Sequence, residues 1–583
     1  LEYRGYDSAG IAIGRRDSGN EIAVRKTVGA PGGLRERIAQ ENLPGTLGIG
    51  HTRWATHGAP TETNAHPHTA AGIAVVHNGI IENDGELRRE LIGAGYQLMS
   101  ETDSEVVPNL IAFHQANGAD LVDAVLTTAA TIRGRSAFAV ISEDDPDTII
   151  AARCGSPLVV GRAEGGAWVS SDGAALCAEA TEVAALEDGE VALLRRDGVT
   201  VLNRDGHPVT REWLPRSATT EVIDHEGYDS FMAKEIAEQA FTISQTAEAT
   251  ETALGVEAFE HLDRLVMIAC GSSRYAAEIG KAWFERYARL PCDVEIASEY
   301  HHRAPIVGTN TMVMGISQSG ETADTLAALD YVRGLGRETA ALVNVPTSQM
   351  ARSCDRVWLT QAGVEIGVAA TKSFTSQLTA LAVLAIRAAA LRGTMDPIEA
   401  QAKIDGIKTF GVEVEALQVS DSALRLWSET MAGESNALFL GRGVSAAVAE
   451  EGALKLKEIS YIHAEAYPSG ELKHGPLALV DERMPVVALV ENGPMLEKSL
   501  SSLQEVMARK GRVFVIGDAR AIAAAEIKGI PGQVLMESDS IVTDISVTLQ
   551  QTVAVQLLAY HTARVRGCDV DKPRNLAKSV TVE

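Results

Sequence analysis

Two segments of this chain repeat one order of features: a short apolar run, a turn with glycine, a serine and a helical stretch. The first copy spans residues 265–273 and the second spans residues 437–445, about 170 residues further on. An apolar run that ends in such a turn before a helix is typical of a strand in a parallel sheet. Because the pattern recurs, we expect two copies of one doubly wound α/β unit. Ligands of such sheets bind at the carboxyl ends of the strands, where both turns lie.

The first part of the chain has a different pattern. Up to about residue 216, short β-type runs alternate with turns rich in Gly, Asp and Asn, and helices are predicted at residues 84–94 and 105–115. This predicts an α+β fold of two stacked sheets flanked by helices. The expected divisions are an N-terminal domain at 1–213, a linker at 214–230, a first α/β subdomain at 231–425, a second at 426–570 and a C-terminal tail at 571–583.

The composition limits the classes of partner. The net charge of −26 argues against nucleic acid, whose phosphates are held mainly by Lys and Arg. The six cysteines form no C-x-x-C pair, which favours a reduced, cytoplasmic protein. The longest apolar candidate, residues 378–386, stops at Arg387, well short of the ~20 residues of a membrane span. We therefore expect a buried helix there, and neither nucleic acid nor a membrane as a partner.

The most informative short motif is the hexapeptide Ser-Gln-Ser-Gly-Glu-Thr at residues 317–322. It follows an apolar run and precedes a predicted helix, so three hydroxyls and a glycine occupy a strand-to-helix turn. Free N–H groups and the helix dipole make such a turn an anion site. The alternative is an ordinary capped helix, because Ser and Thr are preferred N-caps. The second copy has Glu-Asn-Gly-Pro at residues 491–494 instead, so we expect one phosphate site per chain.

A second group of candidates is suited to proton transfer. Glu451, Lys455 and Glu458 are spaced to share one face of the helix that follows the second turn. The alternative is a solvated stripe of salt bridges. With His474, they are the groups that ketose–aldose proton transfer needs beside a sugar phosphate. Lys578 could form a Schiff base with a ketose carbonyl, unless the tail is only a frayed basic terminus.

The N-terminal part carries residues suited to gripping a free amino acid. Arg53 could pair with its carboxylate and Asp103 with its ammonium. Backbone N–H groups at Asn78 and Gly79 could form an oxyanion hole. Five histidines lie within residues 51–77, but without metal-ligand spacing and without cysteine, so we expect no metal.

Taken together, these segments resemble the family of glutamine–fructose-6-phosphate aminotransferases (isomerising), also called glucosamine-6-phosphate synthases. The match runs along the whole chain, and residues 451–467, 471–479 and 574–583 are its most specific parts. The resemblance implies an N-terminal-nucleophile glutaminase domain, an αββα sandwich, followed by two doubly wound sugar-isomerase subdomains. It also implies conversion of D-fructose 6-phosphate and L-glutamine to D-glucosamine 6-phosphate and L-glutamate by a homodimer without a cofactor.

The resemblance further implies roles for single residues. Lys578 would form the imine with the C2 carbonyl, and Glu458 would move the proton between C1 and C2. Lys455 and Glu451 would support this transfer. His474 would assist ring opening in the site of the partner subunit. The remaining expected residues are Ser273, Ser317, Gln318, Ser319, Thr322 and Val368 for the sugar phosphate; Arg53, Thr56, His57, Asn78, Gly79 and Asp103 for glutamine; and Trp54 as the gate of an ammonia tunnel.

The sequence departs from the family pattern at two places. The family's glutaminase nucleophile is a cysteine at the mature N-terminus, upstream of the segment that matches Leu1, and no cysteine here precedes Cys154. We therefore expect an N-terminally truncated chain without the nucleophile and the first strand of the sandwich, unable to hydrolyse glutamine. Ala370 stands where relatives are expected to have serine, which would weaken a sugar contact.

Two other functions stay open. The chain could be an ammonia-dependent synthase or a phosphohexose isomerase alone, since Lys578, Glu458 and His474 are all present. It could instead be a non-catalytic sugar-phosphate sensor. A sensor needs the phosphate turn but not the Lys578 and Glu458 pair, and no helix-turn-helix or basic patch is evident.

Overall fold

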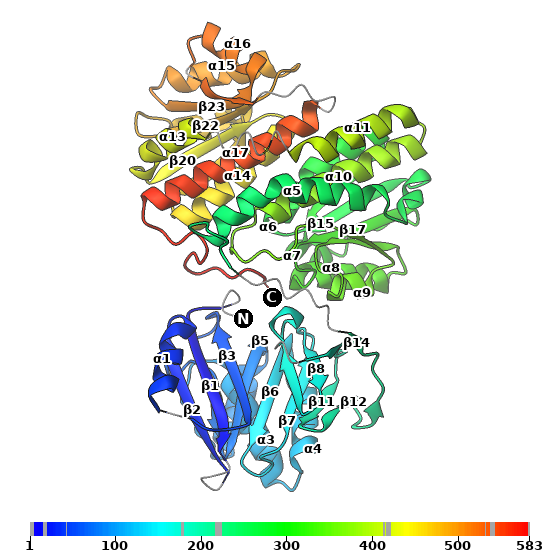
Figure 1. The fold of residues 1–583 in the computed structure, drawn as a ribbon, viewed down its shortest axis with the longest axis vertical. Helices are drawn as coiled ribbons and strands as arrows, with labels where there is room; N and C mark the ends of the chain where they lie inside the picture. The colour runs from blue at the N-terminus through cyan, green and yellow to red at the C-terminus, as the bar shows by residue number, and fades with distance from the viewer. Residues whose placement is uncertain are drawn as a thin grey trace. The chain divides into compact units, whose positions relative to one another are not determined.

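The structure, a computed structural model, describes residues 5–15, 20–41, 43–176, 180–215, 224–411, 414, 421–530, 532–536 and 543–580. Residues 1–4 and 581–583 at the ends of the chain and residues 216–223 of the expected linker lie outside these residues. The chain divides into two compact units (Figure 1). The first comprises Leu1–Val222 together with Ser579–Glu583, and the second comprises Ile223–Lys578.

The first unit is built on three antiparallel sheets. Their strand orders are β13-β12-β11-β7-β6-β5-β4, β2-β1-β3 and β14-β10-β8-β9. The strands are β1 (Ser8–Arg15), β2 (Glu21–Val28), β3 (Leu47–Arg53), β4 (His68–Ala70), β5 (Ile73–Gly79), β6 (Ser136–Ser142), β7 (Ile149–Cys154), β8 (Val159–Ala163), β9 (Gly166–Ser170), β10 (Glu182–Ala185), β11 (Val191–Arg195), β12 (Gly198–Leu202), β13 (Pro208–Val209) and β14 (Leu214–Pro215). The helices are α1 (Pro31–Glu41), α2 (Asp84–Gly93), α3 (Val106–Ala116), α4 (Leu121–Thr131) and the short η3 (Asp103–Glu105) and η4 (Gly173–Ala175).

Strand β6 shows how these layers pack. All of its residues are buried. Phe138 and Val140 belong to a cluster with the apolar residues of α2, α3 and α4. Ala137, Ala139 and Ile141 belong to a second cluster with residues of the two smaller sheets. Because successive side chains point to opposite faces of a strand, helices cover one face of the large sheet and strands cover the other. With α1 packed on β1 and β2, the predicted αββα sandwich is confirmed.

The second unit holds two parallel sheets of the same topology. Their strand orders are β16-β15-β17-β18-β19 and β21-β20-β22-β23-β24, which are the same order when each set is numbered from its own first strand. The strands are β15 (Arg264–Ala269), β16 (Cys292–Ile296), β17 (Thr311–Ser317), β18 (Thr339–Val343), β19 (Arg356–Leu359), β20 (Asn436–Gly441), β21 (His463–Pro468), β22 (Pro485–Val490), β23 (Arg512–Asp518) and β24 (Gly532–Met536). The duplication expected from the repeated turns is confirmed.

Helices cover both sheets. They are α5 (Phe231–Glu251), α6 (Gly271–Trp283), α7 (Ala297–Tyr300), α8 (Ala323–Gly334), α9 (Gln349–Ser353), α10 (Lys372–Leu391), α11 (Pro397–Thr409), α13 (Ser422–Ala432), α14 (Val444–Ser460), α15 (Leu496–Met507), α16 (Ala519–Ile527) and α17 (Thr543–Val565). Single turns of other helix types are η5 (Val256–Glu260), η6 (Phe284–Ala288), η7 (His301–Arg303), η8 (Glu471–His474) and η9 (Pro476–Leu479).

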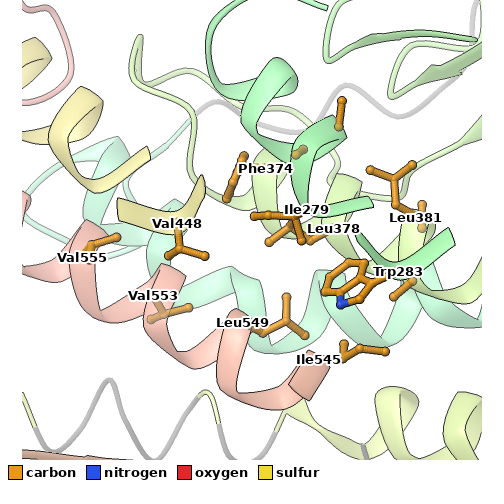
Figure 2. Packing of buried hydrophobic residues seen from close by; sticks show 14 of the residues in the cluster. Ile279, Trp283, Phe374, Leu378, Leu381, Val448, Ile545, Leu549, Val553 and Val555 are labelled. Atoms are coloured by element: carbon orange, nitrogen blue, oxygen red, sulfur yellow. The ribbon is translucent and has the colours of Figure 1, made fainter. Parts of the chain in front are cut away.

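One apolar core joins the two copies of the second unit. Figure 2 shows Trp283 of α6 and Leu381 of α10 in the same cluster as Val448 of α14 and Leu549 of α17. Helices α6 and α10 belong to the first copy, and α14 and α17 to the second. Since a shared core resists separation of its parts, the two sheets are held together by packing and not only by the chain.

Helix α10 is the only described helix that is long and apolar enough to cross a membrane by length and composition alone. Nearly all of its residues are buried against the rest of the second unit. This is the burial of a core helix, and it contains the predicted helix at residues 378–386.

Candidate functional site

The hexapeptide forms the turn between β17 and α8, at the carboxyl end of the first parallel sheet. Gly320 has φ +65°, and a Cβ there would lie 2.1 Å from Ser348 Oγ, so only glycine fits. The Ser317 hydroxyl accepts the Gly320 N–H at 3.1 Å and lies 2.9 Å from the Thr322 hydroxyl. Thr322 occupies the N-cap position of α8, yet its side chain makes no capping hydrogen bond. The hydroxyls therefore face one another across the turn, which is unlike an ordinary capped helix.

In the equivalent turn of the second copy, a backbone N–H group already donates to a carboxylate of the protein. Between β22 and α15, the Asn492 N–H donates to Asp518 Oδ2 at 2.6 Å. Burial raises the pKa of the neighbouring Glu491. The Asn492 N–H is thus bonded to a carboxylate of the protein and is not available to an anionic ligand, which supports a single phosphate site per chain.

Substituting the turn glycine tests its role. Gly320→Ala is expected to weaken binding of fructose 6-phosphate at least tenfold, because a left-handed backbone costs an L-residue roughly 1–2 kcal/mol and the new Cβ would displace Ser348. Titration calorimetry would measure the Kd. Gly334→Ala, at the other end of α8, is the matched control, since no atom lies within 4 Å of a Cβ there. Equal affinity in the two variants would contradict a ligand role for this turn.

The serines of the two repeated turns do not cap the helices that follow them. Cys270 is the N-cap of α6. The Ser272 hydroxyl donates to Glu451 Oε1 at 3.1 Å, and the Ser273 hydroxyl accepts from Gln377 Nε2 at 3.0 Å. In the second copy, Ser445 bonds Gln551. Each serine therefore reaches a side chain of another helix, and Ser272 ties the first copy to α14 of the second.

The charged face of α14 is buried, which rules out the solvated stripe. Lys455 Nζ lies 3.5 Å from Glu451 Oε1 and 2.6 Å from Glu458 Oε2. The side chains of Glu451 and Lys455 are 0% and 1% exposed, whereas Glu458 is 20% exposed. Burial raises the pKa of Glu451 to about 7, although Lys455 opposes this shift. The pKa of Lys455 is raised in spite of burial, because two carboxylates flank the ammonium. Glu458 is thus the member of the group open to solvent and to a ligand.

The side chain of Lys578 is not part of a frayed terminus. It is 5% exposed, donates to the Gly367 carbonyl at 2.8 Å and forms an ion pair with the fully buried Glu365. Next to it, the Val368 N–H donates to the Asp571 carbonyl at 3.0 Å. Sequence reasoning missed Glu365, because 213 positions separate it from Lys578.

The other predicted residues of the second unit have fewer described contacts. Gln318 accepts the Asn344 N–H at 3.1 Å through its carbonyl, and Ser319 Oγ accepts the Glu321 N–H at 3.2 Å. His474 ends η8 and is exposed. Within one chain the structure does not bring His474 to a described partner.

In the first unit, a cavity of about 370 Å³ gathers most of the predicted glutamine residues. It is lined by Arg53, Trp54, Thr56, Asn78, Gly79 and Asp103. His57 is not among the lining residues, and its side chain is exposed. The guanidinium of Arg53 donates to the carbonyls of His57, Gly58 and Ala59, and burial lowers its pKa. Asp103 accepts the Ile81 N–H at 2.8 Å.

A cluster of histidines, whose role the sequence did not suggest, contributes His51, His66 and His77 to the lining of this cavity. The rings of His51 and His66 stack at 4.2 Å, and His68 meets His66 edge-on at 4.8 Å. His77 Nδ1 lies 2.8 Å from the Ser104 hydroxyl. Burial lowers the pKa of His51 to about 3 and that of His68 to about 2. Among the residues that the structure describes, no three His, Cys, Asp or Glu side chains are arranged to hold a metal ion.

These histidines make the first unit sensitive to acid. Their folded pKa values lie below the unfolded value near 6.5, so the unfolded state binds more protons as the pH falls below about 6.5. The free energy of unfolding should then fall by up to about 1.4 kcal/mol per pH unit for each such histidine. Hydrogen-exchange mass spectrometry between pH 7.5 and 5.5 should show lost protection in the first unit. His68→Gln should reduce this pH dependence, whereas His261→Gln, with a side chain 86% exposed, should not.

Comparison with known proteins identifies the families that this chain resembles. The SIS domain family matches residues 259–387 and 430–560, and a glutamine amidotransferase domain family matches residues 51–178. The chain is 44% identical over 598 residues to glutamine–fructose-6-phosphate aminotransferase (isomerizing) of Bordetella pertussis, covering 100% of this chain and 96% of that protein. The protein of that name from Bradyrhizobium diazoefficiens is 45% identical over 596 residues, with the same coverage.

A solved structure matches the second unit. The C-terminal domain of glucosamine-fructose-6-phosphate aminotransferase from Francisella tularensis is 42% identical, with a TM-score of 0.57, and covers 60% of this chain and 100% of that chain. Because the relatives are aligned over 96% of their length and the amidotransferase match is present, the expectation of a truncated chain unable to hydrolyse glutamine is not supported.

Proposed function

We propose that this chain, which belongs to the family of glutamine–fructose-6-phosphate aminotransferases (isomerizing), converts D-fructose 6-phosphate and L-glutamine to D-glucosamine 6-phosphate and L-glutamate. It is an enzyme with a glutamine amidotransferase domain and two SIS domains. We place the domain limits at 1–213, 231–425 and 426–570, with a linker at 214–230 and a catalytic tail at 571–583.

The observation that carries the proposal is the buried amine of Lys578 beside Glu365. Lysine forms imines with carbonyl substrates when its amine is held in a confined site. In the proposed reaction, Lys578 attacks C2 of the open-chain ketose and holds it as an imine. Ammonia released from glutamine then replaces Lys578 at C2.

The carboxylate face of α14 supplies the second half of the chemistry. Glu458 moves the proton between C1 and C2, which converts the ketose skeleton to the aldose. Lys455 holds Glu458 at 2.6 Å, and Glu451 in turn holds Lys455. The phosphate is held by the turn of β17, with Ser317, Gln318, Ser319 and Thr322, together with Ser273 and the backbone at Val368.

Glutamine is assigned to the cavity of the first unit. Arg53 and Asp103 grip its carboxylate and its ammonium, and the N–H groups of Asn78 and Gly79 stabilise the oxyanion. Thr56, which lines the cavity, and His57, whose carbonyl accepts a hydrogen bond from Arg53, complete the grip. Trp54 gates the passage of ammonia. We further propose a homodimer, in which the exposed His474 opens the sugar ring in the partner subunit's site.

Isotope transfer tests this function. The protein is incubated with fructose 6-phosphate and glutamine labelled with ¹⁵N at the amide, and the sugar is analysed by mass spectrometry. Labelled glucosamine 6-phosphate is the expected product. A parallel reaction with ¹⁵N-ammonium isolates the sugar half. Label transferred from ammonium alone would contradict the glutamine assignment, and no amino sugar in either reaction would contradict the whole proposal.

A further inference from the structure

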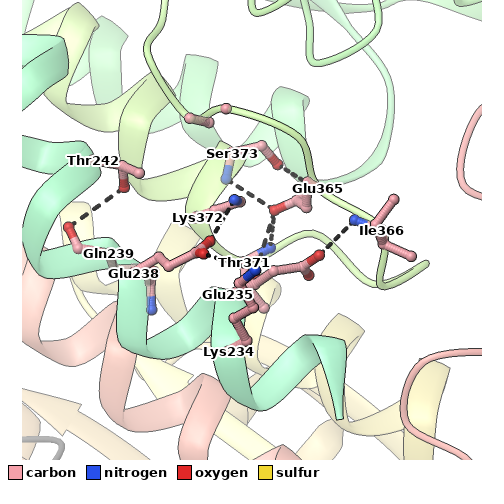
Figure 3. A network of polar contacts seen from close by, with 12 residues as sticks. Lys234, Glu235, Glu238, Gln239, Thr242, Glu365, Ile366, Thr371, Lys372 and Ser373 are labelled. Carbon is pink, nitrogen blue, oxygen red and sulfur yellow. Dashed lines mark hydrogen bonds and ion pairs between the residues drawn. The ribbon is translucent and has the colours of Figure 1, made fainter. Parts of the chain in front are cut away.

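A network of buried carboxylates surrounds the lysine proposed to form the imine. Figure 3 shows Glu365 on the loop that leads into α10 and Glu235 of α5 facing that loop, with Thr371 and Ser373 at the start of α10. Neither carboxylate has a part in the reaction as proposed above. Each is almost completely buried, so each needs a reason to be there.

Glu365 is held rigidly and in its charged form. Its Oε1 accepts the N–H groups of Thr371 and Ser373, each at 3.0 Å, and its Oε2 accepts the Ser373 hydroxyl at 2.6 Å. Burial opposes the charge, but Lys578 and Ser373 outweigh it and lower the pKa of Glu365 to about 2. The two N–H groups lie at the positive end of α10, which also favours an anion.

Glu235 fixes the same loop from the side of α5. Its Oε1 accepts the Gly367 N–H at 3.1 Å and also the Ile366 N–H. The Gly367 carbonyl is the second acceptor of Lys578. Burial, and next the charge of Glu365, raise the pKa of Glu235 to about 8. The pKa values of the two acids thus differ in opposite directions from the ordinary value of a glutamate. At neutral pH, Glu365 carries the charge of the pair.

We propose that Glu365 is the positioning residue of the imine-forming lysine, holding Lys578 Nζ against the Gly367 carbonyl and exchanging one proton with it. This inference rests on the proposed role of Lys578. The Lys578 ammonium first gives one proton to Glu365, and the free amine then attacks C2. A second proton of the same nitrogen moves to the C2 oxygen, which becomes the hydroxyl of a carbinolamine. The proton then returns from Glu365 to that hydroxyl, which leaves as water, and the protonated imine remains. No other reactant is needed, because the proton borrowed in the first step is spent in the second.

The test separates imine formation from sugar binding. The full chain is mixed with fructose 6-phosphate, and the imine is trapped with borohydride and located by peptide mass spectrometry. Glu365→Gln keeps the size of the side chain and an acceptor for the two N–H groups, but it removes the charge. We expect at least tenfold slower trapping on Lys578 with the Kd of fructose 6-phosphate within twofold of the parent protein. A merely structural role would weaken binding as much as trapping.

Two further variants sharpen the outcome. Glu235→Gln is the matched control in the same network; it resembles the neutral acid and should slow trapping less than threefold. Ser373→Ala removes one bond that orients Glu365 and should slow trapping several-fold, so it decides the matter if Glu365→Gln does not fold. Trapping at the parental rate in Glu365→Gln would overturn the inference. If Glu365→Gln does not fold, trapping at the parental rate in Ser373→Ala would overturn it. Absence of any adduct on Lys578 in the parent protein would instead refute the proposed function.

Discussion

Lys578→Ala is expected to abolish glucosamine 6-phosphate formation, with a fall in kcat of about 10³-fold or more, because no other group can take over a covalent step. The same change leaves the buried Glu365 without its cation. Removing one partner of a buried ion pair costs about 3–5 kcal/mol, so the protein should also unfold at a lower temperature. Steady-state kinetics and calorimetry would measure the two effects.

Lys578→Arg separates these effects. Arginine keeps a positive charge near Glu365 but does not form an imine with a ketose, since it stays protonated. We expect it to recover most of the thermal stability and none of the activity. If Lys578→Arg turned over fructose 6-phosphate at a rate near that of the parent protein, the imine assignment would be wrong.

Glu458→Gln is expected to lower kcat by about 10²–10⁴-fold, the usual contribution of a positioned general base. The amide cannot carry the proton from C1 to C2, but the lysine-bound imine can still form. In deuterated water the parent protein should exchange the C1 proton of fructose 6-phosphate, and Glu458→Gln should not, although borohydride still traps the sugar on Lys578.

The control for this variant lies on the same helix. Glu450 lies on another face of α14 and pairs with Arg274 at 3.5 Å. Glu450→Gln should exchange the C1 proton at a rate close to that of the parent protein. Proton exchange that survives in Glu458→Gln would assign the transfer to another base.

Local patterns of the sequence predict much of the second unit. Two apolar runs that each end in a glycine turn predict the duplicated parallel sheets. The glycine of the hexapeptide indicates a tight turn that the φ of Gly320 confirms. The spacing of Glu451, Lys455 and Glu458 places them on one face of α14. These features depend on residues a few positions apart, and local spacing is what a sequence records directly.

These local patterns do not predict which charged side chains are buried or which residues far apart in the sequence form pairs. Three charges on one face of a helix are usually solvated. Packing of α14 against other elements, which includes the hydrogen bond from Ser272 of α6, makes Glu451 a buried acid. Glu365 has no motif of its own, since its partner is a lysine in the tail. The stacking of His51 on His66 depends on a chain reversal between β3 and β4. The spacing of the two histidines in the sequence does not predict this stacking.

The hydrogen bond between Ser272 and Glu451 joins a turn of the first copy to α14 of the second. In the proposed function, the sugar site therefore takes residues from both copies. A single-copy ancestor would have had to meet a second molecule of itself to bring the two parts together, and its activity would have fallen on dilution. Joining the copies in one chain makes this encounter intramolecular, with an effective concentration set by the tether. The parts of the site that come from the two copies therefore meet within one chain, whereas the proposed contribution of His474 still requires the partner subunit.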